Sequence, residues 1–212
     1  RLLREGADVK KGDEVMKVEG RARSILTAER VALNFMGHMS GVATLTLKMV
    51  RAVGNHKAKI AATRKTLPGL RAVQKYAVMI GGGIPHRYGL DDAVLIKDNH
   101  IAMSGGVRSA IRNAKAHIGH TVKIEVEVDT LAQLAEVLEE GVDIVMLDNM
   151  TNAQMKEAVA MVAGRAVVEA SGGVTLARIP EIAATGVDLI SSGAVTHSAP
   201  NFDVGLDYKA AA

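Results

Sequence analysis

The sequence contains no cysteine and no tryptophan, and aromatic residues make up only 2% of its 212 positions. Without cysteine the chain can form neither disulfides nor thiolate metal sites, which favours a cytoplasmic protein over a secreted one. The scarcity of aromatic rings excludes the stacking surfaces on which single-stranded nucleic acids bind, and no block of Lys and Arg takes their place. We therefore expect no nucleic-acid partner, although a net charge of +3 makes the chain mildly basic.

Long apolar segments are also missing. The longest runs, such as residues 143–147 and 166–168, are far shorter than the roughly 20 residues that cross a bilayer, so no membrane partner is expected. The sequence begins at Arg1 with residues typical of the middle of a domain. We expect a truncated or processed N-terminus.

The pattern that is present repeats a short apolar run, a polar or glycine-containing turn and an amphipathic helix. Six runs are predicted to be strands: 58–62, 93–96, 122–128, 143–147, 166–170 and 187–191. Helices are predicted near 69–80, 105–117, 130–140, 151–163 and 175–185. Two helix starts carry capping boxes, Thr130 with Gln133 and Thr151 with Gln154. This alternation predicts a parallel sheet covered by helices, either a barrel or an open doubly wound sheet.

The run 122–128 favours the barrel. Its even-numbered positions are apolar, whereas Lys123, Glu125 and Glu127 share the opposite face because side chains alternate along a strand. An ionic face pressed against helices would be costly, but it can line the interior of a barrel near a polar mouth. The predicted fold class is α/β, with an incomplete or open (β/α) barrel.

The front of the chain differs from the repeat. Residues 14–20 and 21–26 resemble strands, and a helix broken near Ser40-Gly41 is expected from 27 to 53. These strands have too few partners, so we interpret them as the remnant of an N-terminal α/β sandwich domain. The expected division is 1–41 for this remnant and an interdomain helix, 42–195 for the barrel and 196–212 for a C-terminal tail.

Polar residues follow or end all six predicted strands, and in barrel enzymes the active site lies at that end. They are Thr63, Arg64 and Lys65; Lys97, Asp98, Asn99 and His100; Glu127; Asp148 and Asn149; Ser171, Gly172 and Gly173; and Ser191, Ser192 and Gly193. Singly, each has a simpler explanation: a solvated Arg64-Lys65 pair, Asp148 as a helix cap, or Glu127 paired with Lys123. Together they indicate one shared site.

The residue types indicate the ligand. Arg64, Lys65, His86, Arg87 and Lys97 would suit a substrate with more than one carboxylate. The Ser-Gly turns before the last helices would suit a phosphate. Glu127 and Asp148 would suit ribose hydroxyls or a Mg²⁺ that bridges pyrophosphate oxygens.

Seven ordered motifs resemble quinolinate phosphoribosyltransferase, the carboxylating nicotinate-nucleotide pyrophosphorylase. They are TRKTLPGLR (63–71), GGGIPHR (81–87), LIKDNH (95–100), IEVEV (124–128), LDN (147–149), EASGG (169–173) and SSGAVTHS (191–198). AERVALNFMGHMSGVAT (28–44) is similar to the interdomain helix of this family. The resemblance covers nearly the whole chain.

The resemblance implies a pentosyltransferase of NAD biosynthesis that joins quinolinate to phosphoribosyl pyrophosphate, with Mg²⁺, and works as a homodimer with shared sites. Arg30 would reach the quinolinate of the neighbouring subunit, and Lys97, Glu127 and Asp148 would be catalytic. The other implied substrate-binding residues are Thr63, Arg64, Lys65, His86 and Arg87 for quinolinate, and Ser171, Gly172, Gly173, Ser192, Gly193 and Ala194 for the 5-phosphate. Glu127 and Asp148 would also bind the ribose and any metal.

The sequence departs from the family at Leu67 and at Pro85. Pro-His-Arg also occurs in related proteins associated with molybdenum transport, which is one alternative function, although LIKDNH with Lys97 fits the quinolinate enzyme better. Another pyridine or purine-pathway substrate and a non-catalytic phosphoribosyl-binding barrel are further alternatives. With much of the sandwich domain missing, we expect low activity from this chain alone.

Overall fold

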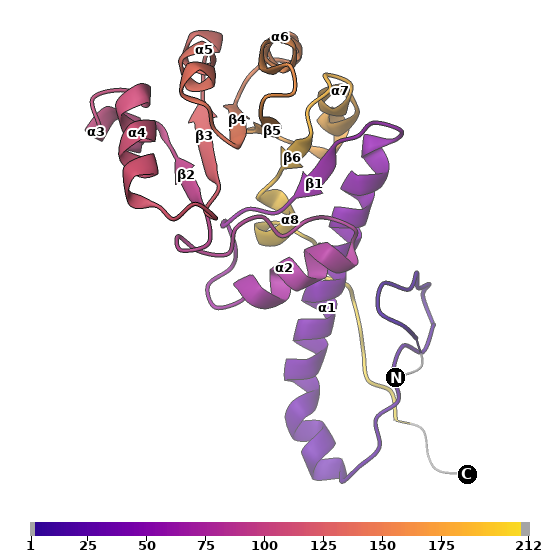
Figure 1. The fold of residues 1–212 in the computed structure, drawn as a ribbon. Helices are drawn as coiled ribbons and strands as arrows, with labels where there is room; N and C mark the ends of the chain where they lie inside the picture. Colours follow the sequence, from indigo (N-terminus) through magenta and orange to yellow (C-terminus); the bar gives the residue numbers. More distant parts are fainter. Residues whose placement is uncertain (1–2, 209–212) are drawn as a thin grey trace.

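The computed structural model describes residues 3–208 and contains one parallel sheet wrapped by helices (Figure 1). The strands are β1 (Lys59–Ala61), β2 (Val94–Ile96), β3 (Ile124–Val128), β4 (Ile144–Asp148), β5 (Val167–Ser171) and β6 (Leu189–Ser191). Their order is β1-β6-β5-β4-β3-β2, and all five pairings are parallel. All six predicted strands are confirmed.

The sheet is a barrel with an open seam. Consecutive strands from β2 to β6 are neighbours, and β1 follows β6, as in a closed (β/α) barrel. Over residues 3–208, however, no ladder joins β1 to β2, and Ile84 forms a single bridge with Ala61 beside the gap. The open α/β barrel predicted from the sequence is confirmed.

Helices cover the outside of the strands (Figure 1). They are α2 (Arg71–Ile80), α4 (Val107–His117), α5 (Leu131–Glu140), α6 (Asn152–Val162), the 3₁₀ helix η1 (Leu176–Arg178) and α7 (Ile179–Ala183). Two short helices, α3 (Asp98–Met103) after β2 and α8 (Ala194–His197) after β6, were not predicted as elements. Both capping boxes are confirmed, because the Thr130 and Thr151 hydroxyls accept from the Gln133 and Gln154 amides at 3.2 and 3.3 Å.

The helix α1 spans Ala22–Val53 without a break. The predicted strand at 21–26 is therefore wrong, and so is the interruption at Ser40-Gly41. Gly41 serves close packing instead: a Cβ there would overlap the Pro200 carbonyl oxygen, and one at Gly37 would lie 2.7 Å from the Phe202 carbonyl. The C-terminal segment crosses α1 at these two glycines, and the Phe202 amide donates to the Gly37 carbonyl at 3.0 Å.

Two further predictions are corrected. Residues 14–20 do not form a strand: the Leu3 amide donates to the Val15 carbonyl at 3.4 Å, but the segment is in no strand ladder, and Met16 and Val18 are about half exposed, at 47% and 51%. Lys123 does not share the ionic interior face, because β3 begins only at Ile124. Its ammonium lies 2.5 Å from the Asp143 carboxylate at the opposite end of the strands.

The core lies between the strands and the outer helices. Val126, Leu147 and Leu134 are fully buried there, and the interior face of the sheet is left for other residues. Among residues 3–208, no helix combines the length and apolar character required to cross a bilayer.

Candidate active site

The strand register determines which side chains line the barrel interior. Glu127 pairs with Met146, Met146 with Glu169, and Glu169 with Leu189, so these residues form one layer. One step toward the strand ends, Asp148 pairs with Ser171, and Ser191 is level with Ala61. Because side chains alternate along each strand, residues of one parity face inward together.

These residues line a cavity of about 220 Å³ at the C-terminal mouth of the barrel. Its walls are Thr63, Arg64, Lys65, His86, Arg87, Leu95, Lys97, Glu127, Met146, Asp148, Glu169, Ser171 and Ser191. Nine of them are predicted site residues: Thr63, Arg64, Lys65, His86, Arg87, Lys97, Glu127, Asp148 and Ser171. The mouth thus brings together the ends of all six strands, as barrel enzymes require.

Four cationic side chains line the cavity, and they are here called the cationic wall: Arg64, Lys65, Arg87 and Lys97. Burial and the nearby Arg64 guanidinium lower the pKa of Arg87, which shows that like charges lie close together. Arg87 is held by the Ala93 carbonyl, which accepts from its Nη1 at 3.1 Å. Arg64 Nε is buried and has no hydrogen-bond partner among the described residues. Mutual repulsion and an unused donor are the properties of a site built for an anion.

Carboxylates also line the cavity. The Lys97 ammonium forms an ion pair with Glu127, joining the end of β2 to the end of β3. Asp148 Oδ2 accepts a hydrogen bond from the side-chain amide of Asn149 at 2.6 Å. Two of the simpler explanations raised by the sequence do not apply. Glu127 pairs with Lys97 rather than with Lys123, and Thr151 rather than Asp148 caps α6.

The glycine turns after β5 and β6 lie at the rim. Gly172 and Gly173 have φ of 84° and 57°, which favours glycine. A Cβ at Gly193 would lie 3.0 Å from Lys65 Cδ, so this turn approaches the cationic wall. Gly172, Gly173, Ser192, Gly193 and Ala194 are not among the cavity walls, and the Ser192 amide already donates to the Ala61 carbonyl at 3.1 Å.

Arg30 is not brought into the cavity of its own chain. It lies on the exposed first half of α1, which extends away from the barrel (Figure 1).

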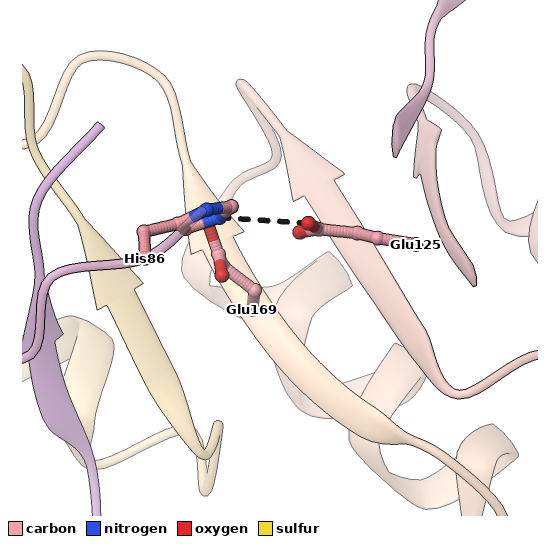
Figure 2. A group of neighbouring side chains, drawn as sticks. All are labelled: His86, Glu125 and Glu169. Carbon is pink, nitrogen blue, oxygen red and sulfur yellow. Dashed lines mark ion pairs between the residues drawn. The ribbon is translucent and has the colours of Figure 1, made fainter. Parts of the chain in front are cut away.

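Two acidic residues were missed as site members, Glu125 and Glu169. They lie on β3 and β5 next to His86 (Figure 2), and of the two only Glu169 is among the cavity walls. Their side chains are only 4% and 1% exposed. The signal that could have found them is parity, because Glu125 is two residues before Glu127 and Glu169 is two residues before Ser171. Ser191 at the end of β6 lines the same cavity; the sequence placed it among the strand-end residues of a shared site but assigned it no ligand.

A second hollow, of about 460 Å³, lies at the opposite end of the strands and includes Lys57, Asp143 and Asp188. Its charges are already satisfied by Lys57 with Asp188 and by Lys123 with Asp143, both at 2.5 Å. The C-terminal mouth, with its unpaired polar atoms, is therefore the candidate site.

An α/β barrel whose charged residues meet where the strands end belongs to the class of barrel enzymes that act on anionic substrates. Its family follows from comparison. Residues 42–207 match the quinolinate phosphoribosyl transferase C-terminal domain, and residues 1–40 match the N-terminal domain of the same family. The chain belongs to the quinolinate phosphoribosyl transferase family.

Individual relatives agree with this assignment. The nicotinate-nucleotide pyrophosphorylase [carboxylating] of Mycobacterium leprae is 48% identical over 208 residues, covering 97% of this chain and 73% of that protein. The probable enzyme of the same name from Bacillus subtilis is 42% identical over 204 residues, covering 96% and 71%. The crystal structure of NadC from Streptococcus pyogenes matches with a TM-score of 0.91 and 44% identity, covering 95% and 71%.

Proposed function

We propose that this chain transfers the phosphoribosyl group of phosphoribosyl pyrophosphate to quinolinate and that the product decarboxylates to nicotinate mononucleotide. The pyridine nitrogen attacks the anomeric carbon, pyrophosphate leaves, and the new pyridinium accepts the electron pair of the breaking carbon–carboxylate bond. The observation that carries the proposal is that one cavity is lined by Arg64, Arg87 and other cations together with the carboxylates of Glu127 and Asp148.

The cationic wall binds quinolinate. Arg64 and Arg87 supply planar guanidinium groups that match carboxylates, and Lys65 and Lys97 add point charges. A dianion would offset the repulsion that these groups exert on one another and would satisfy the unused Arg64 Nε. Thr63 belongs to the same lining, where its hydroxyl accepts from the Lys65 amide at 3.0 Å.

Glu127 and Asp148 bind the ribose. Positive charge builds on the ribose ring as pyrophosphate leaves, and two fixed carboxylates beside it would stabilise that charge. By donor type they also fit a Mg²⁺ bound together with substrate phosphates, since both line the cavity at the ends of neighbouring strands. When bound, the ion would neutralise pyrophosphate oxygens.

The turns 171–173 and 192–194 hold the 5-phosphate. They follow the last two strands, the position where barrels commonly bind phosphate. Lys65 passes over Gly193, so the phosphate turn and the quinolinate wall are adjacent.

Pro85, the departure shared with proteins associated with molybdenum transport, is compatible with the quinolinate enzyme. Lys75 donates to the Pro85 carbonyl, a group that proline retains, so the residue type at this position does not change the hydrogen bond. Lys97, Glu127 and Asp148 line the same cavity as His86, the residue that follows Pro85.

The proposal is tested by measuring the binding of each substrate separately by calorimetry. Arg64→Ala and Lys97→Ala are expected to weaken quinolinate binding about 10- to 100-fold, because a charged hydrogen bond contributes about 1.5–3 kcal/mol. Glu127→Ala and Asp148→Ala are expected to weaken phosphoribosyl pyrophosphate binding instead. Lys156→Ala, an exposed residue of α6, serves as the control.

Each turnover must also release one carbon dioxide from quinolinate and one pyrophosphate from phosphoribosyl pyrophosphate. Equal losses of affinity for the two substrates in every variant would contradict the division of roles. Turnover of nicotinate without release of carbon dioxide would contradict quinolinate as the substrate.

A further inference from the structure

His86, Glu125 and Glu169 form a compact group at the cavity (Figure 2), in which His86 and Glu169 are cavity walls and Glu125 is buried next to them. His86 Nε2 lies 3.5 Å from Glu125 Oε2 and 3.5 Å from Glu169 Oε1. Within residues 3–208, Glu125 Oε1 and both Glu169 oxygens have no hydrogen-bond partner. Two buried carboxylates that face one ring and have few other partners destabilise the folded chain. Their presence therefore indicates a functional role.

The backbone at His86 is also unusual. Its φ of 53° is in the left-handed region, which is uncommon for a residue other than glycine and costs about 1 kcal/mol. In this conformation His86 Nδ1 accepts a hydrogen bond from the Arg87 amide at 2.7 Å. The ring therefore connects the two carboxylates to the backbone of Arg87.

The same three side chains are a ligand set that a divalent cation could use, but the hydrogen bond to Nδ1 argues against one. Nδ1 must be unprotonated to accept from the Arg87 amide, and a metal on Nε2 would also require that nitrogen to be unprotonated. The neutral ring carries one proton, which leaves Nε2 as the donor. The geometry thus directs an N–H, and not a lone pair, at the carboxylates.

We propose that Glu125 and Glu169 are positioning residues that hold the His86 ring and, through it, the turn that presents Arg87 to the pyridine substrate. This rests on the proposed function, because it assumes that Arg87 binds quinolinate. Neither carboxylate touches the substrate in this assignment.

The charges around the ring agree with a shared proton. Burial opposes a charged ring, but the interactions with Glu125 and Glu169 outweigh burial and raise the pKa of His86 to about 9. Because Nδ1 accepts from the Arg87 amide, it carries no proton, so the ring is neutral in this arrangement. The extra proton then lies on the Glu125–Glu169 pair, where burial and the nearby Glu169 raise the pKa of Glu125. The other charged groups of this cavity are Arg64, Lys65, Arg87, Lys97, Glu127 and Asp148, with Lys75 behind the turn.

The first experiment measures KM and kcat for each substrate in Glu169→Gln and in Glu125→Gln. The quinolinate KM is expected to rise roughly tenfold, because displacement of a binding group by about 1 Å can cost up to 10²-fold. The KM for phosphoribosyl pyrophosphate is expected to stay within about twofold, since carboxylates that act only through His86 leave its subsite intact. Glu140→Gln, a glutamate of α5 with a side chain 11% exposed and paired with Arg112, is the control.

A double-mutant cycle then asks whether Glu169 acts through His86. His86→Asn removes the ring, and asparagine tolerates a positive φ better than most residues. In the His86→Asn background, Glu169→Gln is expected to have no further effect on the quinolinate KM. If His86→Asn does not fold, the Glu125→Gln/Glu169→Gln pair replaces it. Its histidine ¹⁵N shifts are expected to show loss of the acceptor state at His86 Nδ1.

Three results would overturn the inference. One is an unchanged quinolinate KM in both glutamine variants, and another is full additivity in the cycle. The third is a stoichiometric metal in the purified chain, measured by elemental analysis, that Glu169→Gln abolishes. Failure of the unmutated chain to use quinolinate would instead overturn the proposed function, so the two failures are distinguishable.

Discussion

Lys75 is fully buried, and backbone carbonyls accept the hydrogen bonds of its ammonium. Its ammonium donates to the Pro85 carbonyl and, at 2.8 Å, to the Arg87 carbonyl, and it lies 5.1 Å from the centre of the Tyr88 ring. The turn with His86 and Arg87 is therefore held from behind by one residue of α2. Burial, followed by the nearby Arg71, lowers the pKa of Lys75 to about 8 from its ordinary value of 10.5.

This lowered pKa predicts a pH-dependent stability. Between about pH 8 and 10.5 the unfolded chain binds a proton that the folded chain has released, so the free energy of unfolding rises with pH across this window. Lys75→Met removes this contribution. The free energy of unfolding of the unmutated chain minus that of the variant should therefore increase as pH rises from about 8 to 10.5. Urea unfolding at several pH values measures it.

The control for Lys75 is Lys156→Met, which replaces an exposed lysine of α6. The difference in free energy of unfolding between the unmutated chain and Lys156→Met should not change with pH. If Lys75→Met behaves in the same way, the lysine carries no buried charge.

At the scale of elements, periodicity predicted what depends on local pattern. All six strands and the two capped helices followed from alternation and from Thr-x-x-Gln spacing. Contacts between distant segments could not be predicted: Gly41 suggested a break in α1 because nothing in the sequence indicates that residue 200 crosses there. Glu127 was found near a strand end. Glu125 lies one layer deeper, and Glu169 is level with Glu127 but buried, so both need a tertiary partner that the sequence does not reveal.

Gly41→Ala is expected to destabilise the chain although it improves the helix. Alanine raises helix propensity by about 1 kcal/mol, but its Cβ would overlap the Pro200 carbonyl oxygen, and overpacking typically costs about 1–3 kcal/mol. We expect a lower melting temperature and faster proteolysis of residues 199–208. Gly205→Ala, in the same segment with no atom within 4 Å of the added Cβ, is the control. A more stable Gly41→Ala chain would show that the segment does not pack on α1.

At the scale of the whole molecule, the start of α1, residues 22–36, is largely exposed in the described chain. Its side chains include Leu26, Val31 and Phe35, which are 67%, 59% and 45% exposed. Arg30 lies on the same exposed half, which extends away from the cavity that it is expected to serve (Figure 1). An apolar surface of this kind indicates association, and a second copy of the chain would cover it and bring Arg30 to another cavity.

Complementation distinguishes a shared site from a self-contained one. Arg30→Ala and Lys97→Ala are each expected to abolish most activity. In a mixed dimer, however, the cavity of the Arg30→Ala subunit keeps Lys97 and receives Arg30 from its partner, so one of the two sites is intact. Random exchange of subunits should then restore about a quarter of the activity of the unmutated chain. If Arg30 serves its own cavity, every site in the mixture carries one defect, and mixing restores nothing.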